Sequence, residues 1–255
     1  MHVHAADSRR NPDPEPHSEP PNTEPLTTEP SSTEPFSTLL WADIEATRTA
    51  IDELPFIGQL GDGSLAPDQF SYYLAQDARY LAAYSRVLAE ASALAPTAAE
   101  REFWAAGSAG CIEVELELHR NWLAGHVTDP APGPVTAAYI DHLRAVSAAG
   151  NYAVLLAAVL PCYWLYADVG ERLHAGYRAR KSEAPHPYAD WLETYADEAF
   201  AAATRQAIAL TDAAATTAST VDRALMRVAF ARSAALELLF FDAPRLHAPH
   251  LHAPG

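Results

Sequence analysis

The segment from Tyr152 to Ala167 constrains the fold of this chain more than any other part of the sequence. It holds 16 consecutive residues without a charge, whereas a membrane-spanning helix needs about 20 apolar residues. Pro161 lies inside it, and a proline within a helix leaves a carbonyl about one turn earlier without its N–H partner. A helix that is apolar on every side is buried. The segment therefore predicts the central helix of a helical bundle, with a kink at Pro161 that places Cys162 in a pocket.

Six other segments show helical spacing of apolar residues or helix-start signals. Alanine and leucine dominate, and no run of β-branched residues alternates with period two. With the central helix, which runs on to about Ala179, this predicts a single all-α, up-and-down bundle of about seven helices. A glycine-containing loop at Gly58, Gly61 and Gly63 separates the first two helices. The six other predicted helices cover residues 37–54, 66–88, 98–123, 135–149, a segment from near 188, and 217–241.

Residues 1–36 differ in character from the rest of the chain. They carry eight of the 20 prolines and no apolar periodicity, and they repeat a hydroxyl-acid-proline unit such as Thr23-Glu24-Pro25. Such a segment buries too little apolar surface to offset the entropy of ordering it. We therefore expect a disordered tail at 1–36, a helical domain at 37–243 and a second disordered tail, rich in histidine and proline, at 244–255.

The overall charge and the cysteine count exclude several classes of protein. The chain has 17 basic and 33 acidic residues, and an acidic surface repels nucleic-acid phosphates and anionic lipids. We therefore expect no nucleic-acid partner and no membrane partner. Cys111 and Cys162 are too few for a disulfide framework, and no signal peptide is recognisable at the N-terminus. These features favour a cytoplasmic protein.

Two acids lie among apolar neighbours within predicted helices. Asp77 falls between Leu74 and Leu81, and Glu237 is surrounded by leucine, alanine and phenylalanine. Burial raises the pKa of a carboxyl group into the range of a general acid or base. The alternative for Asp77 is a structural role, as a cap or as the partner of an arginine such as Arg48, and the alternative for Glu237 is a place on a narrow solvated face.

The pair Glu115 and His119 shares a helix face at a spacing of four residues, which could form half of a metal site. The neighbouring acids Glu113 and Glu117 make a solvated stripe the better interpretation. We expect no metal here.

Cys162 and Tyr166 lie one turn apart, with Tyr163 and Trp164 beside them. If Tyr139 and Tyr195 from other helices converge on them, the rings would line a pocket suited to a flat heteroaromatic ligand. The alternative is that all are ordinary core aromatics. Cys111 has no such neighbours and is interpreted as core filler.

Several stretches together resemble the thiaminase II (TenA) family of the haem-oxygenase-like fold, in the branch that carries the cysteine. They follow the family's order from about Leu40 to Asp242. The matching stretches are Leu54-Pro55-Phe56 with Gly61 to Leu65, Tyr73 to Leu81 with its Gln-Asp-x-x-Tyr-Leu pattern, Glu115 with His119, Leu160-Pro161-Cys162-Tyr163-Trp164-Leu165-Tyr166, Trp191 to Tyr195, and Phe230 to Glu237.

The resemblance implies an aminopyrimidine aminohydrolase of thiamine salvage, which converts 4-amino-5-aminomethyl-2-methylpyrimidine to the hydroxymethyl compound and can also split thiamine. In family terms Cys162 would be the nucleophile that adds to the pyrimidine ring, and Glu237 the acid/base. Asp77 would bind the aminopyrimidine edge. No metal or organic cofactor is implied, and homotetramers are usual in the family.

The resemblance also assigns roles to four tyrosines. Tyr80 and Tyr139 would support the nucleophilicity of the sulfur, whereas Tyr166 and Tyr195 would line and bind the ring. The chain departs from the family at the acid, where Ala235-Leu236 precede Glu237 and Phe240-Phe241 follow it. Aromatic residues before the acid and a Phe-Trp pair after it are common in the family, so we expect a wider or less polar pocket floor.

Two alternatives stay open. One is a different enzyme on the same fold, such as a haem or di-iron oxygenase or a cofactor-free oxidase. None of the eleven histidines lies between Ser18 and Leu118, which removes a proximal haem ligand from the first helices. The other is a non-catalytic pyrimidine-binding or regulatory protein, although the chain is not basic enough for direct DNA contact.

Overall fold

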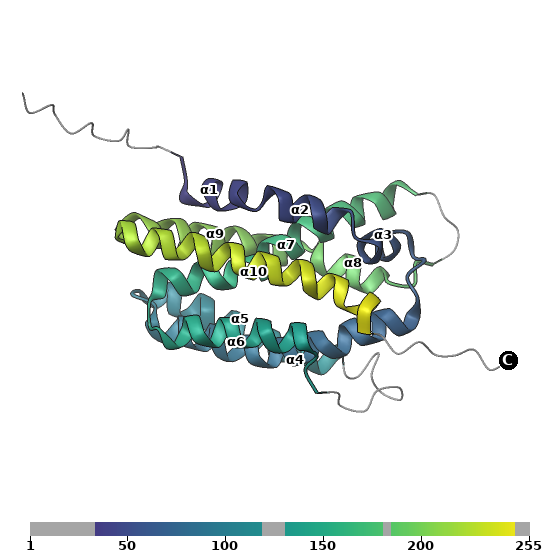
Figure 1. Cartoon of the computed structure of the whole chain (residues 1–255), viewed down its shortest axis with the longest axis horizontal. Helices are drawn as coiled ribbons and strands as arrows, with labels where there is room; N and C mark the ends of the chain where they lie inside the picture. The colour runs from purple at the N-terminus through teal and green to yellow at the C-terminus, as the bar shows by residue number, and fades with distance from the viewer. Residues whose placement is uncertain (1–33, 119–130, 181–184, 248–255) are drawn as a thin grey trace, which may run out of the picture. The chain divides into compact units, whose positions relative to one another are not determined.

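A computed structural model describes residues 34–118, 131–180 and 185–247 of the chain. The described residues form ten helices (Figure 1). In chain order they are α1 (Phe36–Asp43), α2 (Glu45–Asp52), α3 (Pro55–Asp62), α4 (Pro67–Leu94), α5 (Ala98–Leu118), α6 (Pro134–Ala148), α7 (Tyr152–Ala179), α8 (Ala189–Tyr195), α9 (Glu198–Thr217) and α10 (Thr220–His247).

The helix α7 is the centre of the bundle, as the sequence predicts. The residues from Leu155 to Leu160 are fully buried, because α9, α10, α8 and α4 all pack against this helix. By length and composition α7 is the one helix among the described residues that could cross a membrane, but 78% of its apolar window is buried inside the protein. Its apolar surface is therefore the core of the bundle.

The α7 helix continues through Pro161, and side chains from neighbouring helices bind two carbonyls in the preceding turn. The Tyr84 hydroxyl donates to the carbonyl of Val159 at 2.7 Å, and the Ser233 hydroxyl donates to that of Ala158 at 2.7 Å. Buried carbonyls need such partners. These bonds tie α4 and α10 to the turn of α7 that carries Cys162.

The number of helices differs from the predicted seven, although the all-α class is confirmed. The first predicted helix is two helices, α1 and α2, which are separated at Ile44. The helix predicted to begin near residue 188 is also two helices, α8 and α9. Asp197 caps the start of α9 by accepting a hydrogen bond from the Ala199 N–H at 2.8 Å.

The predicted loop at Gly58, Gly61 and Gly63 is wrong for its first two glycines, which lie in α3. Pro55 ends one helix and also occupies the first turn of the next, where its missing N–H costs nothing. Gly63 is the turn residue, with φ of 82°, a left-handed conformation that favours glycine.

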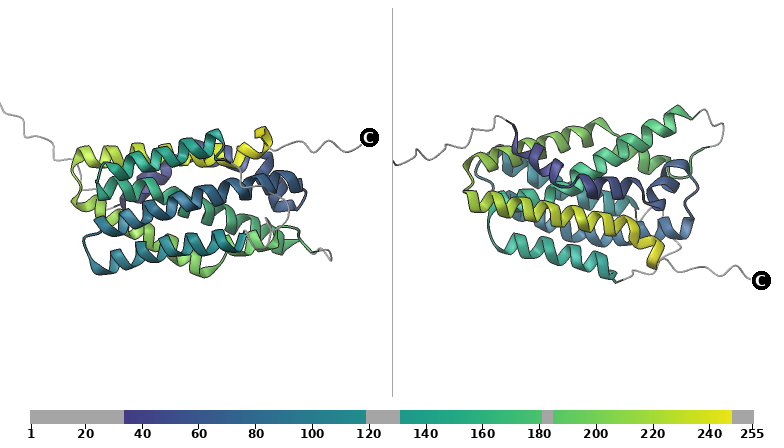
Figure 2. Two further views of the ribbon diagram at one scale, coloured as in Figure 1. Left: turned by 90° about the horizontal axis from the view of Figure 1, so that it is seen from below. Right: turned by 45° about the horizontal axis from the view of Figure 1, so that its top comes forward.

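The first two helices lie along α9 and α10 (Figures 1 and 2). Asp212 of α9 accepts hydrogen bonds from the backbone N–H of Ser37 at 2.6 Å and from its hydroxyl at 2.8 Å. Trp41 stacks on Trp164 of α7 with ring centroids 4.2 Å apart. These contacts attach the N-terminal helices to the bundle on the outside of α7.

The predicted domain limits stay predictions. The structure describes α10 as continuous to His247 and α1 as beginning at Phe36. Most of the two segments predicted as tails, 1–36 and 244–255, lies outside the described residues.

Candidate active site

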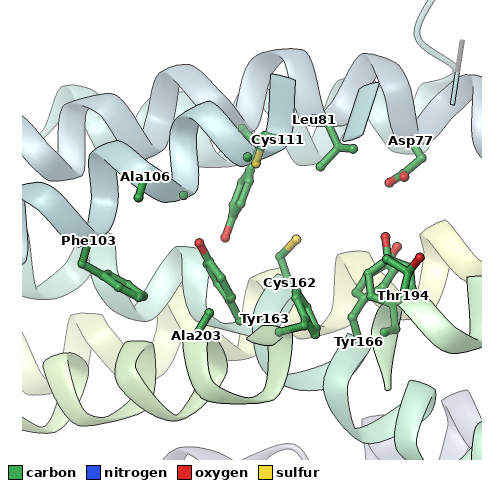
Figure 3. A pocket seen from close by; sticks show the side chains of 15 residues that line it. Asp77, Leu81, Phe103, Ala106, Cys111, Cys162, Tyr163, Tyr166, Thr194 and Ala203 are labelled. Carbon is green, nitrogen blue, oxygen red and sulfur yellow. The ribbon is translucent and has the colours of Figure 1, made fainter. Parts of the chain in front are cut away.

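A cavity of about 430 Å³ lies between α4, α5 and the helices α7, α8 and α9. Aromatic and small side chains make up most of its wall, with two thiols and one carboxyl group (Figure 3). The lining residues are Asp77, Leu81 and Tyr84 of α4; Phe103, Ala106, Gly107, Gly110 and Cys111 of α5; Cys162, Tyr163 and Tyr166 of α7; Thr194 and Tyr195 of α8; and Phe200 and Ala203 of α9.

The Cys162 side chain points into the cavity from α7 (Figure 3). Burial, followed by the nearby carboxyl group of Glu237, raises the pKa of the thiol well above its ordinary value, while the interaction with Tyr80 lowers it. Both burial and the nearby carboxyl group thus favour the protonated thiol over the thiolate. The thiol must lose its proton during any reaction in which it acts as a nucleophile.

Asp77 faces the same cavity from α4 and is 3% exposed. Burial raises the pKa of its carboxyl group to about 7, so both the neutral and the charged form are accessible near neutral pH. The predicted alternative, a pair with Arg48, is wrong, because the Arg48 guanidinium lies over the ring of Trp41 at 4.4 Å from its centroid.

Glu237 is buried on α10, as predicted, and is 1% exposed. The hydroxyl of Tyr139 donates a hydrogen bond to its Oε1 at 2.8 Å. Burial raises the pKa of Glu237 to about 8, although the Tyr139 hydrogen bond lowers it. Glu237 does not line the cavity itself. Its charge is close enough to raise the pKa of Cys162.

Tyr80 and Tyr139 stand next to each other with ring centroids 4.7 Å apart, and neither lines the cavity. The Tyr80 hydroxyl is buried with no hydrogen-bond partner within the described residues. Because its interaction lowers the pKa of the Cys162 thiol, it is placed to stabilise negative charge on the sulfur. Cys162 therefore lies between the cavity and a cluster of two tyrosines and one glutamate.

Tyr166 and Tyr195 both line the cavity, with ring centroids 4.8 Å apart. A chain of buried hydrogen bonds orients Tyr166. Trp191 Nε1 donates to the Tyr73 hydroxyl at 3.3 Å, and the Tyr73 hydroxyl donates to that of Tyr166 at 3.2 Å. The predicted convergence of the three rings is thus only partly confirmed, because Tyr139 does not line the cavity.

The structure corrects the interpretation of Cys111. This thiol lines the cavity from α5 and is half-buried. Burial raises its pKa to about 12. Three further lining residues were not predicted from the sequence: Phe103 of α5, and Phe200 and Ala203 of α9. Their spacing along those helices is the spacing of any buried helix face. The sequence around them therefore does not distinguish cavity-lining residues from ordinary core residues.

The side chains of Glu115 and His119 lie outside the described residues. Within the part of the chain that the structure describes, no group of three or more histidine, cysteine, aspartate or glutamate side chains could hold a metal ion. The predicted absence of a metal therefore stays a prediction.

The helical bundle has the haem-oxygenase-like fold. The backbone matches a solved domain from Shewanella denitrificans that is described as having a heme oxygenase-like fold, with a TM-score of 0.65 at 14% identity, over 84% of this chain and 94% of that one. A TenA homologue from Pyrococcus horikoshii matches with a TM-score of 0.73 at 25% identity, over 83% of this chain and 98% of that one.

The chain belongs to the TENA/THI-4/PQQC family, whose model matches residues 42–246. It is 32% identical to the aminopyrimidine aminohydrolase of Bacillus subtilis, over 73% of this chain and 80% of that protein. It is 44% identical to the thiamine biosynthesis multifunctional protein ThiED of Corynebacterium efficiens, over 80% of this chain. The chain spans only about a quarter (27%) of the length of that relative.

Proposed function

We propose that this protein is an aminopyrimidine aminohydrolase of thiamine salvage, which replaces the amino group on the exocyclic methylene of 4-amino-5-aminomethyl-2-methylpyrimidine by a hydroxyl group. The observation that carries the proposal is that the Cys162 thiol and the Asp77 carboxyl group face one aromatic cavity. Membership of the family and the similarity to the Bacillus subtilis enzyme support it.

Asp77 suits the edge of an aminopyrimidine. The exocyclic amino group of the ring donates a hydrogen bond, and the adjacent ring nitrogen accepts one. A carboxyl group with a pKa of about 7 can accept from the amino group and, in its protonated form, donate to the ring nitrogen. The rings of Tyr166 and Tyr195 supply aromatic surface for the bound pyrimidine.

The proposed reaction begins with addition of the Cys162 sulfur to the pyrimidine ring. The electron pair released into the ring expels the amino group from the methylene, and this group takes up a proton as ammonia. Water then adds to the methylene and loses a proton, and the sulfur departs. Glu237, with a pKa of about 8, would exchange these protons, and the hydroxyls of Tyr80 and Tyr139 would stabilise the sulfur as it becomes charged.

Release of ammonia from 4-amino-5-aminomethyl-2-methylpyrimidine tests this proposal. We expect turnover by the wild type and a loss of about a hundredfold or more in both Cys162→Ser and Glu237→Gln, since each removes a group that takes part in bond or proton transfer. Thermal protection by the pyrimidine without ammonia release would instead support a non-catalytic pyrimidine-binding protein. Cleavage of thiamine releases the thiazole in place of ammonia, so it is measured separately, as formation of the hydroxymethyl pyrimidine from thiamine.

The cytoplasmic location and the homotetramer implied by the family resemblance belong to the same proposal. Light scattering of the purified full chain measures its mass in solution, and a value near that of a monomer would exclude the tetramer.

A further inference from the structure

The cavity has two ends, on opposite sides of Cys162. Asp77, Tyr166 and Thr194 lie on one side of the sulfur, whereas Phe103 and Ala106 lie on the other (Figure 3). We call the second region the far chamber. Phe103, Ala106 and Ala203 form part of its wall.

The two ends are too far apart for a single-ring pyrimidine to fill both. Asp77 and Tyr84 are seven residues apart on α4, which corresponds to about 10 Å along the helix axis. The cavity volume of about 430 Å³ falls in the range of sites for drug-sized ligands, roughly 300–1,000 Å³. A pyrimidine held by Asp77 therefore leaves the far chamber free for another part of the substrate.

The far chamber is apolar and aromatic. Phe200 stacks with Tyr163 at 6.1 Å between centroids, and Phe103 lies 6.5 Å from the same ring. A Cβ atom at Gly107 would come within 2.6 Å of the Tyr163 hydroxyl. The absence of a side chain at Gly107 therefore makes room for the Tyr163 ring in the cavity wall. Among the described lining residues, Asp77 is the one charged side chain, and it lies at the opposite end.

We propose that this protein accepts aminopyrimidines whose exocyclic methylene nitrogen carries an uncharged apolar or aromatic substituent, and that the far chamber binds this substituent. The inference rests on the proposed function, because it places the methylene beside Cys162. In the reaction the bond between the methylene carbon and the nitrogen breaks, and the nitrogen leaves with the electron pair and a proton as a free amine. The oxygen of water forms the new bond to carbon and gives up one proton.

Binding tests the far chamber independently of catalysis. The probes are 4-amino-2,5-dimethylpyrimidine and 4-amino-2-methyl-5-(2-phenylethyl)pyrimidine, which has no leaving group and places a phenyl ring beyond the methylene. We expect the phenylethyl compound to bind the wild type at least tenfold more tightly in calorimetry. Equal or weaker binding of the phenylethyl compound would overturn the inference, whatever the activity of the protein.

Two variants locate the phenyl group. Ala203→Leu and Ala106→Leu add volume to the far chamber from α9 and α5, and either is expected to remove most of the tenfold preference. Because Ala106 is exposed, its variant is expected to fold even if Ala203→Leu does not. The matched control is Ala202→Leu, an exposed neighbour on α9 outside the cavity. A preference that survives in both chamber variants would place the phenyl group elsewhere.

Turnover separates this inference from the proposed function. With the N-benzyl derivative of the aminomethyl pyrimidine, the wild type should release benzylamine, and Ala106→Leu should lower the ratio of kcat/KM for the benzyl and parent substrates about tenfold. Hydrolysis of the parent alone would overturn the inference but keep the proposed function. Hydrolysis of neither compound, with the binding preference intact, would overturn the proposed function and the substrate role of the far chamber, leaving it as a binding site.

Discussion

The hydroxyl of Tyr139 on α6 donates a hydrogen bond to Glu237 on α10 at 2.8 Å, in a region where both side chains are almost completely buried. This bond stabilises the carboxylate and so lowers the pKa of Glu237, but burial is the larger effect and holds it at about 8. The pKa of Glu237 is thus set by two opposing effects, burial and the hydrogen bond from Tyr139.

Removal of the Tyr139 hydroxyl should raise the pKa of Glu237. In Tyr139→Phe the lowering contribution is lost, and a hydrogen bond to a charged group contributes about 1.5–3 kcal/mol, where about 1.4 kcal/mol corresponds to one pH unit. We expect the midpoint near pH 8 in the profile of kcat/KM to rise by about one unit. The same midpoint should vanish in Glu237→Gln, and a downward shift in Tyr139→Phe would contradict the assignment.

The buried proton of Glu237 also makes the stability of the fold depend on pH. The folded-state pKa of about 8 exceeds the ordinary value of 4.5, so the folded state binds more protons than the unfolded state between these values. Stability from this group is complete below about pH 4.5 and is lost as the pH rises through 8. Glu237→Gln removes this dependence.

We therefore expect the stability of Glu237→Gln relative to wild type to improve between pH 5 and pH 8 by about 2 kcal/mol or more. Urea unfolding at the two pH values measures it. The exposed Glu90→Gln on α4 serves as the control. A relative stability of Glu237→Gln that is equal at both pH values would show that Glu237 is ionised in the folded protein.

The two cavity thiols should differ in their effect on catalysis. Cys162→Ser is expected to lose about a hundredfold or more of the turnover, because serine is a far poorer nucleophile at this site. Cys111→Ser, on the opposite wall of the cavity, should stay within about tenfold of wild type. Comparable losses in the two variants, measured as ammonia release, would mean that Cys162 has no special role.

Asp77→Asn should weaken binding of the pyrimidine. Asparagine can offer the same neutral hydrogen bonds but cannot become a carboxylate that pairs with a protonated pyrimidine ring. The charge-assisted hydrogen bond is therefore lost, and one such bond corresponds to about tenfold to a hundredfold in affinity. Calorimetry with the hydroxymethyl pyrimidine measures the loss. Glu90→Gln on the same helix should bind as the wild type does, and unchanged affinity in Asp77→Asn would remove Asp77 from the binding site.

A small substitution on α7 should disturb the wall of the cavity from a distance. A Cβ atom at Gly170 would lie 2.7 Å from the backbone oxygen of Tyr195 and 2.5 Å from its Cβ. Gly170→Ala therefore has to displace α8, at a cost of about 1–3 kcal/mol, and to move Tyr195.

Gly176 on the same helix is the matched control. A Cβ atom there meets nothing within 4 Å, so Gly176→Ala should stabilise the protein by about 0.5–1 kcal/mol because glycine weakens a helix. Thermal unfolding of the two variants should thus shift in opposite directions. A Gly170→Ala variant as stable as wild type would mean that α8 can move freely away from α7.

Much of the fold follows from local pattern. The uncharged run from Tyr152 to Ala167 has to be buried, and Asp77 and Glu237 are buried for the same reason, because each stands among apolar residues at helical spacing. The helix count was harder to predict, since Pro55 stops one helix and starts another. A proline at a first helical position and a proline after a helix look alike in the sequence.

The sequence by itself determined that the chain forms an all-α bundle, which helix is central and which two acids are buried, because apolar spacing along one helix decides which face avoids water. Only the tertiary structure decided that Cys111 faces the cavity, that Tyr139 bonds Glu237, and that α5 and α9 close the far chamber. These relationships depend on the rotation and axial position of one helix against another. Such relative positions are set by packing across the whole bundle, and the spacing within a single helix does not contain them.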